Sequence, residues 1–225
     1  MEIKAVIFDF DGTLYDFKGL PKNLVFSSLH NILKINAVQK VRRKLKGIDF
    51  SSSDEYKLDF FKELKVLGGF KNEDDAINWY KNVYMVKMIL VLTKKYHKRP
   101  DVEKVINILK SKNIKVAIYS DYGMLKERLC AIGLNNDFIS SIDGIFSSED
   151  FGCLKPAKRG FLEVAKKLNV SPENCLMIGD RKDTDGEGAF SANMQFVEIK
   201  THKTKKEYKP QHQLVAFEDL YNLFN

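Results

Sequence analysis

The sequence predicts an α/β fold, a doubly wound parallel sheet with an α-helical segment inserted after its first strand. After about residue 100, short apolar runs alternate with segments of helical periodicity, a pattern typical of parallel βαβ units. Between the first apolar run and this alternating part, only helical spacing is found. We therefore expect an α/β core formed by residues 1–14 and 100–225, and an α-helical insertion formed by residues 15–99.

Each strand of the core is predicted from a short apolar run. The first run, IKAVIF at residues 3–8, is continuous, as expected for a strand buried on both faces. The other expected strands are 115–120, 142–146, 175–179 and 195–199. The expected helices of the core are 102–110, 124–131, 156–168, 184–192 and 214–224, with a basic loop at 201–213.

In the insertion, apolar residues recur three or four positions apart, which predicts about four helices. The groups with this spacing are Val25, Leu29, Ile32 and Leu33, then Val38, Val41 and Leu45, then Leu58, Phe61 and Leu64. Asn72 and the three acidic residues after it predict an N-cap with an acidic first turn. We expect the aromatic and methionine residues that follow to form the core of the helical bundle rather than a cofactor site.

Composition limits the class of protein. Of 225 residues, 44% are apolar, which favours a packed core over disorder. No apolar run is long enough for a membrane helix, no secretory signal is recognisable, and the three widely spaced cysteines do not suggest a disulfide framework. We expect a cytoplasmic protein without a membrane partner.

The net charge of +7 is unevenly distributed. Between Tyr15 and Lys98 there are 17 basic and 9 acidic residues, whereas the rest of the chain is close to neutral. This excess predicts either an anionic ligand for the insertion or a solubilising surface.

The stretch VIFDFDGTL (residues 6–14) places two carboxylates, Asp9 and Asp11, at the end of a buried strand. Like charges so close repel one another, and a divalent cation removes the repulsion. Mg²⁺ prefers oxygen ligands and is commonly held by one or two carboxylates together with substrate phosphate. The glycine that follows allows a tight turn and a close approach to a ligand.

Polar residues also follow two other predicted strands. Ser120 ends the strand 115–120 and Asp121 follows it, and Asp180 follows the strand 175–179, with Asp185 shortly after. Lys155 precedes a predicted helix. Because the carboxyl ends of parallel strands lie at one edge of a sheet, we expect these side chains to converge as a nucleophile, a metal site, an oxygen donor and a cation for phosphoryl transfer.

These residues resemble the four motifs of the haloacid dehalogenase-like hydrolase superfamily, in the family's order. DFDGTL is similar to the first motif, Ser120 to the second, Lys155-Pro156 to the third, and GDRKDTD (residues 179–185) to the fourth. The helical insertion resembles the cap that this family places between motifs one and two. The resemblance implies a Rossmann-like core with a helical cap.

The resemblance also implies a role for each matching residue. Asp9 would be the nucleophile that forms an aspartyl-phosphate, and Asp11 the acid and base, with its backbone carbonyl on the metal. The side chain of Ser120, the adjoining Asp121 and Lys155 would bind the substrate phosphate. The Mg²⁺ ligands would be Asp9, Asp11 and Asp180, with Asp185 and Thr13 in supporting positions.

Within the family, Asp11 favours phosphoryl chemistry, because the related dehalogenases lack an acid there. The predicted function is a Mg²⁺-dependent phosphatase that hydrolyses a small phosphorylated metabolite, which the basic cap suggests is strongly acidic. A sugar-phosphate mutase similar to β-phosphoglucomutase and a phosphonate-cleaving enzyme with a cap lysine stay open. A non-catalytic or nucleic-acid-binding module is less expected, since no nucleic-acid-binding motif is found. Monomer and dimer are both compatible with the sequence.

Overall fold

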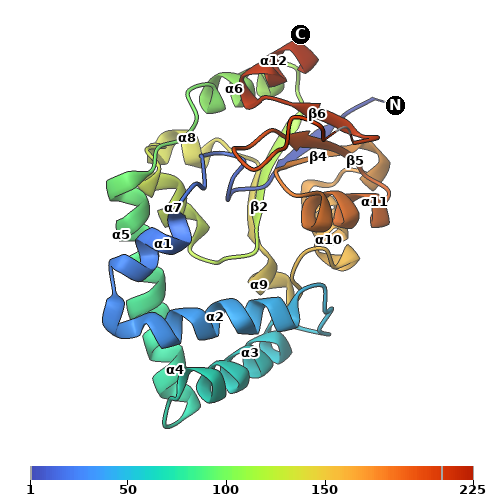
Figure 1. Cartoon of the computed structure of the whole chain (residues 1–225). Coiled ribbons are helices and arrows are strands. Elements are labelled where there is room, and N and C mark those ends of the chain that lie inside the picture. The colour runs from blue at the N-terminus through green and yellow to red at the C-terminus, as the bar shows by residue number, and fades with distance from the viewer. Residues whose placement is uncertain (1, 209, 225) are drawn as a thin grey trace.

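The computed structural model describes residues 2–208 and 210–224. In this part of the chain, six strands form one sheet in the order β3-β2-β1-β4-β5-β6, and all neighbouring strands are parallel. The strands are β1 (Ala5–Phe8), β2 (Lys115–Ser120), β3 (Gly144–Ser147), β4 (Cys175–Gly179), β5 (Gln195–Ile199) and β6 (Gln213–Val215). The predicted doubly wound parallel sheet is therefore confirmed (Figure 1).

Alternate residues of the central strand β1 enter two separate apolar clusters. Val6 and Phe8 belong to a cluster that includes residues of α6 (Val102–Ser111) and α12 (Leu220–Phe224), whereas Ala5 and Ile7 pack with residues of α10 (Lys158–Leu168) and α11 (Glu187–Ser191). Because both faces are covered, a continuous apolar run is the pattern expected for this strand. The helices of the core are α6 (Val102–Ser111), α7 (Leu125–Ala131), α8 (Asn136–Ser140), α9 (Ser148–Phe151), α10 (Lys158–Leu168), α11 (Glu187–Ser191) and α12 (Leu220–Phe224).

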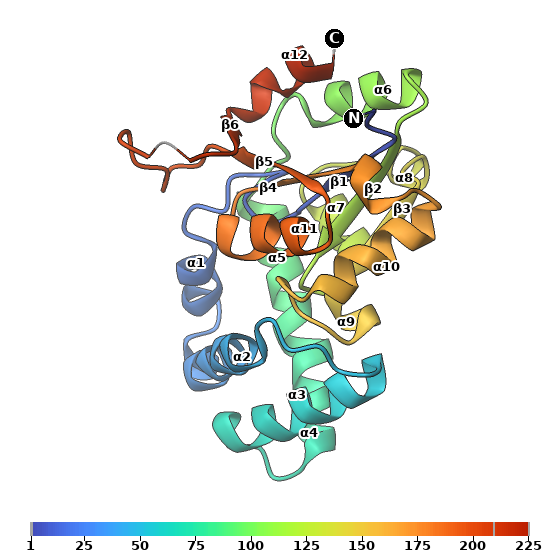
Figure 2. The same ribbon diagram turned by 90° about the vertical axis from the view of Figure 1, so that its right-hand side faces the viewer.

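The insertion after β1 is helical. Its helices are α1 (Leu20–Phe26), α2 (Ile32–Leu45), α3 (Ser53–Gly68), α4 (Glu73–Trp79) and α5 (Val86–Lys95), and a π-helical segment, Tyr80–Met85, joins α4 to α5 without a break. Asn72 caps α4 as predicted, because its Oδ1 accepts a hydrogen bond of 2.8 Å from the amide of Asp75. Helices α2, α3 and α4 lie at the end of the molecule opposite α12 (Figures 1 and 2).

Two segments that connect the insertion to the core lie side by side. Tyr15 and Lys98 form an antiparallel bridge. The guanidinium group of Arg99 donates hydrogen bonds to the backbone carbonyls of Thr13 (2.9 Å) and Gly12 (3.1 Å). The end of the insertion therefore fixes the loop that follows β1.

The predicted closing helix 214–224 is wrong in its first part. Leu214 and Val215 belong to β6, which pairs with β5, and α12 begins only at Leu220. An apolar run of this length does not distinguish a short edge strand from the first turn of a helix, and the free edge of β5 decides the outcome here.

The first predicted apolar helix of the insertion is also wrong as one unit. Helix α1 ends at Phe26, and α2 begins at Ile32 after a 3-10 turn. Leu29 and Leu33 are 60% and 77% exposed, so they do not contribute to the bundle core. The core of the insertion contains the aromatic and methionine residues predicted for it, together with most of the apolar residues of the next two predicted groups: Trp79, Tyr80, Tyr84, Met85, Met88, Val38, Val41, Leu45, Phe61 and Leu64.

Candidate active site

The register of the three central strands explains why the predicted site residues meet. Phe8 of β1 lies opposite Ile118 of β2 and Ile178 of β4. Asp9 follows Phe8 directly, Ser120 ends β2, and Asp180 follows β4. These three side chains therefore start from adjacent strand ends, at the edge of the sheet where open α/β folds bind ligands.

Lys155 is the cation at the centre of the site. Its Nζ is buried and donates to Oδ1 of Asp9 (2.8 Å), to Oδ1 of Asp185 (2.8 Å) and to the carbonyl of Tyr119 (2.9 Å). Burial by itself would lower the pKa of Lys155, but Asp185 and Asp9 raise it above its ordinary value. The lysine is therefore charged at neutral pH and holds two carboxylates in place.

Asp9 is buried at the end of β1. Thr13 Oγ1 lies 3.3 Å from its Oδ2 and donates to it, while Lys155 bonds its Oδ1. Burial raises the pKa of Asp9 well above its ordinary value, and Lys155 opposes this rise. A carboxylate oriented by two donors and placed in a poorly solvated site is suited to act as a nucleophile.

Three carboxylates form a group that fits a divalent cation. Asp9, Asp180 and Asp185 each offer one oxygen, and these oxygens lie within 4.8 Å of one another. Burial, followed by repulsion from Asp185, raises the pKa of Asp180 to about 7. Oδ1 of Asp180 is buried and has no hydrogen-bond partner among the described residues. A buried acceptor without a donor, within a group of acids, is the arrangement that a bound cation would satisfy.

Gly12 allows the loop after β1 to approach Asp180. Its φ of +97° is a backbone conformation that favours glycine, and a Cβ at this position would lie 2.3 Å from Oδ2 of Asp180. The glycine of the first motif is therefore required both by the turn and by the carboxylate opposite it.

Asp11 has partners that the sequence did not reveal. Tyr15 donates from its hydroxyl to Oδ1 of Asp11, and the fully buried Arg128 donates from Nη2 to Oδ2. Oγ of Ser120 lies 3.4 Å from the same Oδ2. The position of Arg128 carried a usable signal, since it interrupts the apolar face of α7 three residues after Leu125.

Asp121 lies at the site, and hydrogen bonds from two neighbouring residues fix the orientation of its side chain. Its Oδ1 accepts hydrogen bonds from Ser148 Oγ (2.7 Å) and from the backbone amide of Lys155 (3.0 Å). The side chain therefore links the loop after β2 to the segment that carries Lys155. Its predicted role in binding substrate phosphate stays a prediction.

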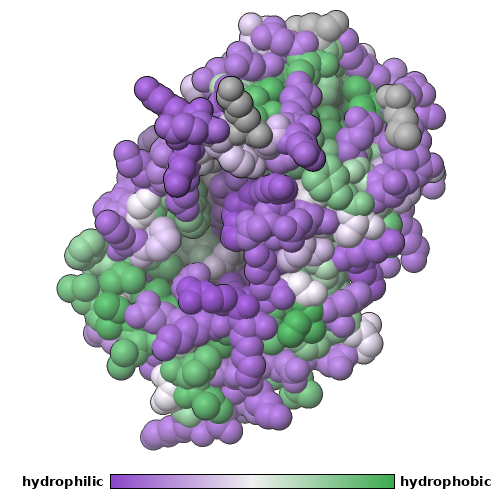
Figure 3. All heavy atoms as spheres, turned by 45° about the vertical axis from the view of Figure 1, so that its right-hand side comes forward, coloured by the Kyte–Doolittle hydropathy of each residue, from purple (hydrophilic) through white to green (hydrophobic). Residues whose placement is uncertain are grey.

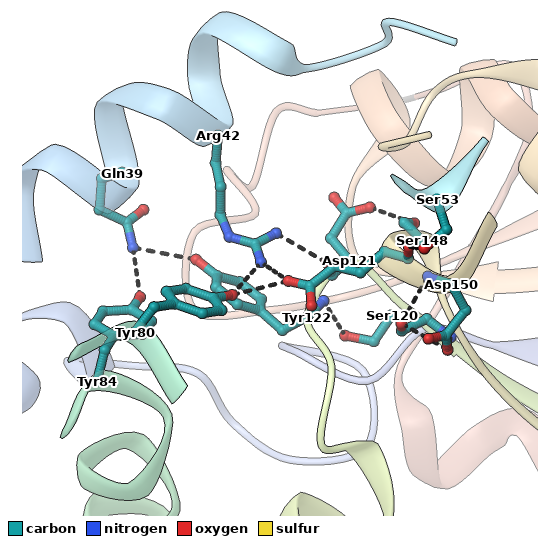
Figure 4. Close-up of polar contacts among 12 residues, drawn as sticks. Gln39, Arg42, Ser53, Tyr80, Tyr84, Ser120, Asp121, Tyr122, Ser148 and Asp150 are labelled. Carbon is teal, nitrogen blue, oxygen red and sulfur yellow. Dashed lines mark hydrogen bonds and ion pairs between the residues drawn. The ribbon is translucent and has the colours of Figure 1, made fainter. Parts of the chain in front are cut away.

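A buried arginine of α2 joins the insertion to the loop after β2 (Figure 4). Arg42 donates to the carbonyl of Asp121 (2.8 Å) and to the hydroxyl of Tyr80 (2.8 Å), and it forms an ion pair with Glu149. Its guanidinium carbon also lies 3.6 Å from the ring centroid of Tyr122. The sequence indicated Arg42 only as one of the basic residues of the insertion, and it gave no reason to expect Tyr122 or Glu149 as its partners.

A cavity of about 290 Å³ lies between α2 and the strand ends, and Lys155 and Asp121 are part of its wall. The opposite wall is formed by Gln39, Arg42, Arg43 and Lys46 of the insertion. The space-filling view shows a hollow near the centre of one face, with hydrophilic side chains on its rim (Figure 3). The candidate site is therefore a small polar pocket enclosed by two parts of the chain.

Comparison with known proteins agrees with this arrangement. The sequence profile of the haloacid dehalogenase-like hydrolases matches residues 3–193. The chain therefore belongs to this family, and the predicted enzyme class, a hydrolase of the haloacid dehalogenase-like type, is confirmed.

Individual relatives cover nearly the whole chain. The glyceraldehyde 3-phosphate phosphatase of Methanothermobacter thermautotrophicus is 27% identical over 219 residues, which cover 91% of this chain and 89% of the relative. The protein of the same name from Methanocaldococcus jannaschii is 27% identical over 213 residues, covering 90% and 87%. A crystal structure of a phosphatase of this family from Thermococcus onnurineus matches with a TM-score of 0.64 and 22% identity, covering 99% and 98%.

None of the described helices is both long and apolar enough to cross a bilayer.

Proposed function

We propose that the chain is a phosphatase that hydrolyses a small phosphorylated metabolite through an aspartyl-phosphate on Asp9. The observation that carries this proposal is the position of Asp9, which is held between Lys155 Nζ and Thr13 Oγ1 beside two further carboxylates. The relatives named glyceraldehyde 3-phosphate phosphatase support the reaction class.

In the first step, an oxygen of Asp9 attacks phosphorus, and the bond from phosphorus to the ester oxygen breaks. Asp11 donates a proton to the departing oxygen, so that an alcohol is released. In the second step Asp11 takes a proton from water, and the hydroxide attacks phosphorus and releases inorganic phosphate, which regenerates the carboxylate of Asp9.

The remaining residues orient these groups and balance their charge. Lys155 offsets negative charge on Asp9 and the phosphoryl group, and Ser120 offers a hydroxyl to a phosphoryl oxygen. Arg128 and Tyr15 fix the carboxylate of Asp11 in one orientation.

The residues present fit Mg²⁺ as the cofactor. Asp9 and Asp180 would hold it through their carboxylates and Asp11 through its backbone carbonyl, with Asp185 kept nearby by its bond to Lys155. When bound, Mg²⁺ would neutralise charge on the phosphoryl oxygens and lower the cost of bringing a phosphate dianion next to three acids.

The helical insertion, residues 15–99, would act as a cap that encloses the substrate. The cavity between α2 and the strand ends, about 290 Å³, suits a small metabolite rather than a polymer. Its basic wall is consistent with the expectation of an acidic substrate. A cytoplasmic location and a monomeric or dimeric state stay predictions.

The test is phosphate release from an aryl phosphate and from glyceraldehyde 3-phosphate, with and without Mg²⁺. We expect turnover that requires the metal and that is lost in Asp9→Asn, which keeps the shape of the side chain but removes the nucleophile. Turnover in Asp9→Asn at the wild-type rate would refute the assignment. Conversion of a hexose phosphate to its isomer, without phosphate release, would favour the mutase instead.

A further inference from the structure

The charge of the cavity between α2 and the strand ends exceeds what a single phosphate needs. Five of its ten lining side chains are cationic, and Asp121 is its one acidic residue among those described. Under the proposed function, on which this inference rests, one phosphate is transferred. The other cations of the cavity can therefore bind another part of the substrate.

Two of the five cations are already committed to other groups. Lys155 is bonded to Asp9 and Asp185, deep in the site. Arg42 is paired with Glu149. The cations that line the rest of the cavity are Arg43, Lys46 and Arg181.

These three cations come from both sides of the pocket. Arg43 and Lys46 lie at the end of α2, whereas Arg181 follows β4 and Asp180 in the core. Asp183 pairs with Lys46 and Arg181, and Asp180 and Asp185 also act on the charge of Arg181 from the core. None of these three acids lines the cavity, so the described residues of its wall include more cations than acids.

The position of Asp183 shows that one carboxylate can bridge the two sides. Its Oδ2 lies 2.5 Å from Nζ of Lys46 and 2.7 Å from Nη2 of Arg181, and its Oδ1 lies 3.1 Å from Nε of Arg181. The structure thus already holds a carboxylate between the cap and the core in charge-assisted hydrogen bonds.

We infer that the substrate is a phosphate ester with a second anionic group, a carboxylate or a second phosphate, which binds to Arg43, Lys46 and Arg181. The scissile phosphate lies beside Asp9 and Lys155, and the second anion lies in the part of the pocket that these three cations line. An anion that contacts the cap and the core together also favours the enclosed arrangement of the pocket. The three cations therefore select the substrate by binding its leaving group, the alcohol that carries the second anion.

The test compares esters that differ in one group. Glyceraldehyde 3-phosphate and 3-phosphoglycerate share a carbon chain, but the second has a carboxylate in place of the aldehyde. Propane-1,3-diol monophosphate and bisphosphate make the same comparison for a second phosphate. We expect kcat/KM to be about tenfold higher for at least one anionic member of these pairs, the size expected for charge-assisted bonds at partly exposed groups.

Variants with opposite expected effects separate a role in selection from a structural role. Arg43→Gln and Lys46→Gln should lower the preference for the anionic ester about tenfold while changing turnover of the neutral ester little. Asp183→Asn should raise the preference, because it removes the acid that competes for Lys46 and Arg181. Lys44→Gln is the matched control, since Lys44 also lies near the end of α2 but is exposed, pairs with Glu63 and does not line the cavity.

The outcomes distinguish this inference from the proposed function. Equal kcat/KM within both pairs, or variants that affect neutral and anionic esters alike, would overturn the inference while leaving the phosphatase in place. Calorimetric titration of the same esters without Mg²⁺ measures the preference independently of turnover. Tighter binding of an anionic ester, weakened in Lys46→Gln, supports the inference even if no ester is hydrolysed, a result that would count against the phosphatase alone.

Discussion

Replacement of Arg42 by methionine tests how the helical insertion is attached to the loop after β2. Methionine is unbranched and replaces the aliphatic part of the arginine side chain, so the substitution removes mainly the guanidinium group with its charge and hydrogen bonds. In the wild type these bonds go to Asp121, Tyr80 and Glu149, and the guanidinium group stacks on the ring of Tyr122.

The expected cost follows from burial. Arg42 is 8% exposed and the Glu149 side chain 19%, so removal of the cation leaves a carboxylate with little solvent around it. Breaking one side of a buried ion pair costs about 3 to 5 kcal/mol, and we expect the lower part of this range because Tyr80 still donates to Glu149. In a double-mutant cycle with Glu149→Gln, the coupling should be about 1.5 kcal/mol or more.

The assay is urea unfolding at pH 7 for the wild type, Arg42→Met, Glu149→Gln and the double variant, with kcat/KM for the aryl phosphate measured alongside. We expect kcat/KM to fall in Arg42→Met, because the loop that follows Ser120 loses the hydrogen bond from Arg42 to the carbonyl of Asp121. A loss of unfolding free energy below about 1 kcal/mol, a size typical of exposed ion pairs, would refute the idea that this arginine ties the two parts together. Additive effects in the cycle would contradict a direct Arg42–Glu149 interaction.

Three further substitutions test other parts of the site. Gly12→Ala should weaken Mg²⁺ binding, so that activity requires a higher Mg²⁺ concentration, because the added Cβ would lie 2.3 Å from Oδ2 of Asp180; an unchanged metal titration would contradict this. Arg128→Met should lower the free energy of unfolding by about 3 to 5 kcal/mol by leaving Asp11 without its buried cation, with partial recovery in Arg128→Lys; wild-type stability in urea would refute the pairing. Asp183→Asn should cost about 0.5 to 1 kcal/mol at pH 7, because partial burial, which would raise the pKa of Asp183, is outweighed by hydrogen bonds from its two cations that lower this pKa to about 2. A carboxylate with a lowered pKa stabilises the fold when the pH is above its ordinary pKa, and this effect is lost as the pH falls to the lowered value. The difference in urea midpoint between Asp183→Asn and the wild type should therefore disappear near pH 2, and a difference that stays constant with pH would contradict the assignment.

The core of the fold followed from sequence because local and long-range preferences agree there. The runs at 115–120, 175–179 and 195–199 become strands with the predicted bounds, since each is short and largely apolar. The error at Leu214 arose because a three-residue edge strand has no periodicity of its own, and only the unpaired edge of β5 makes it a strand.

The residues of the site could be predicted from the sequence where the proposed chemistry requires a particular residue type at a strand end. The carboxylates at 9, 11 and 180 are the residues expected where a cation must be bound at strand ends, and the structure places Asp9 and Asp180 in one group. By contrast, Arg42 and Arg128 are surface residues by composition. The apolar neighbours of Arg128 in α7 hint at its burial, but the partners of the two arginines, Glu149 and Asp11, lie 107 and 117 positions away, and no local pattern identifies these partners.

The exposure of the first helices of the insertion could not be predicted for a related reason. Leu29 and Leu33 have helical spacing with Val25, but the chain turns after Phe26 and directs them to the surface. Periodicity predicts which residues share a face only while one helix continues.

The proposed mechanism depends above all on the phosphorylation of Asp9 during turnover. The most direct measurement is rapid acid quench of the enzyme with substrate and Mg²⁺, reduction of any acyl phosphate with borohydride, and peptide mapping by mass spectrometry. We expect homoserine in place of aspartate at position 9, dependent on substrate and absent without it. Turnover with an unmodified Asp9, or reduction at another carboxylate, would contradict the mechanism.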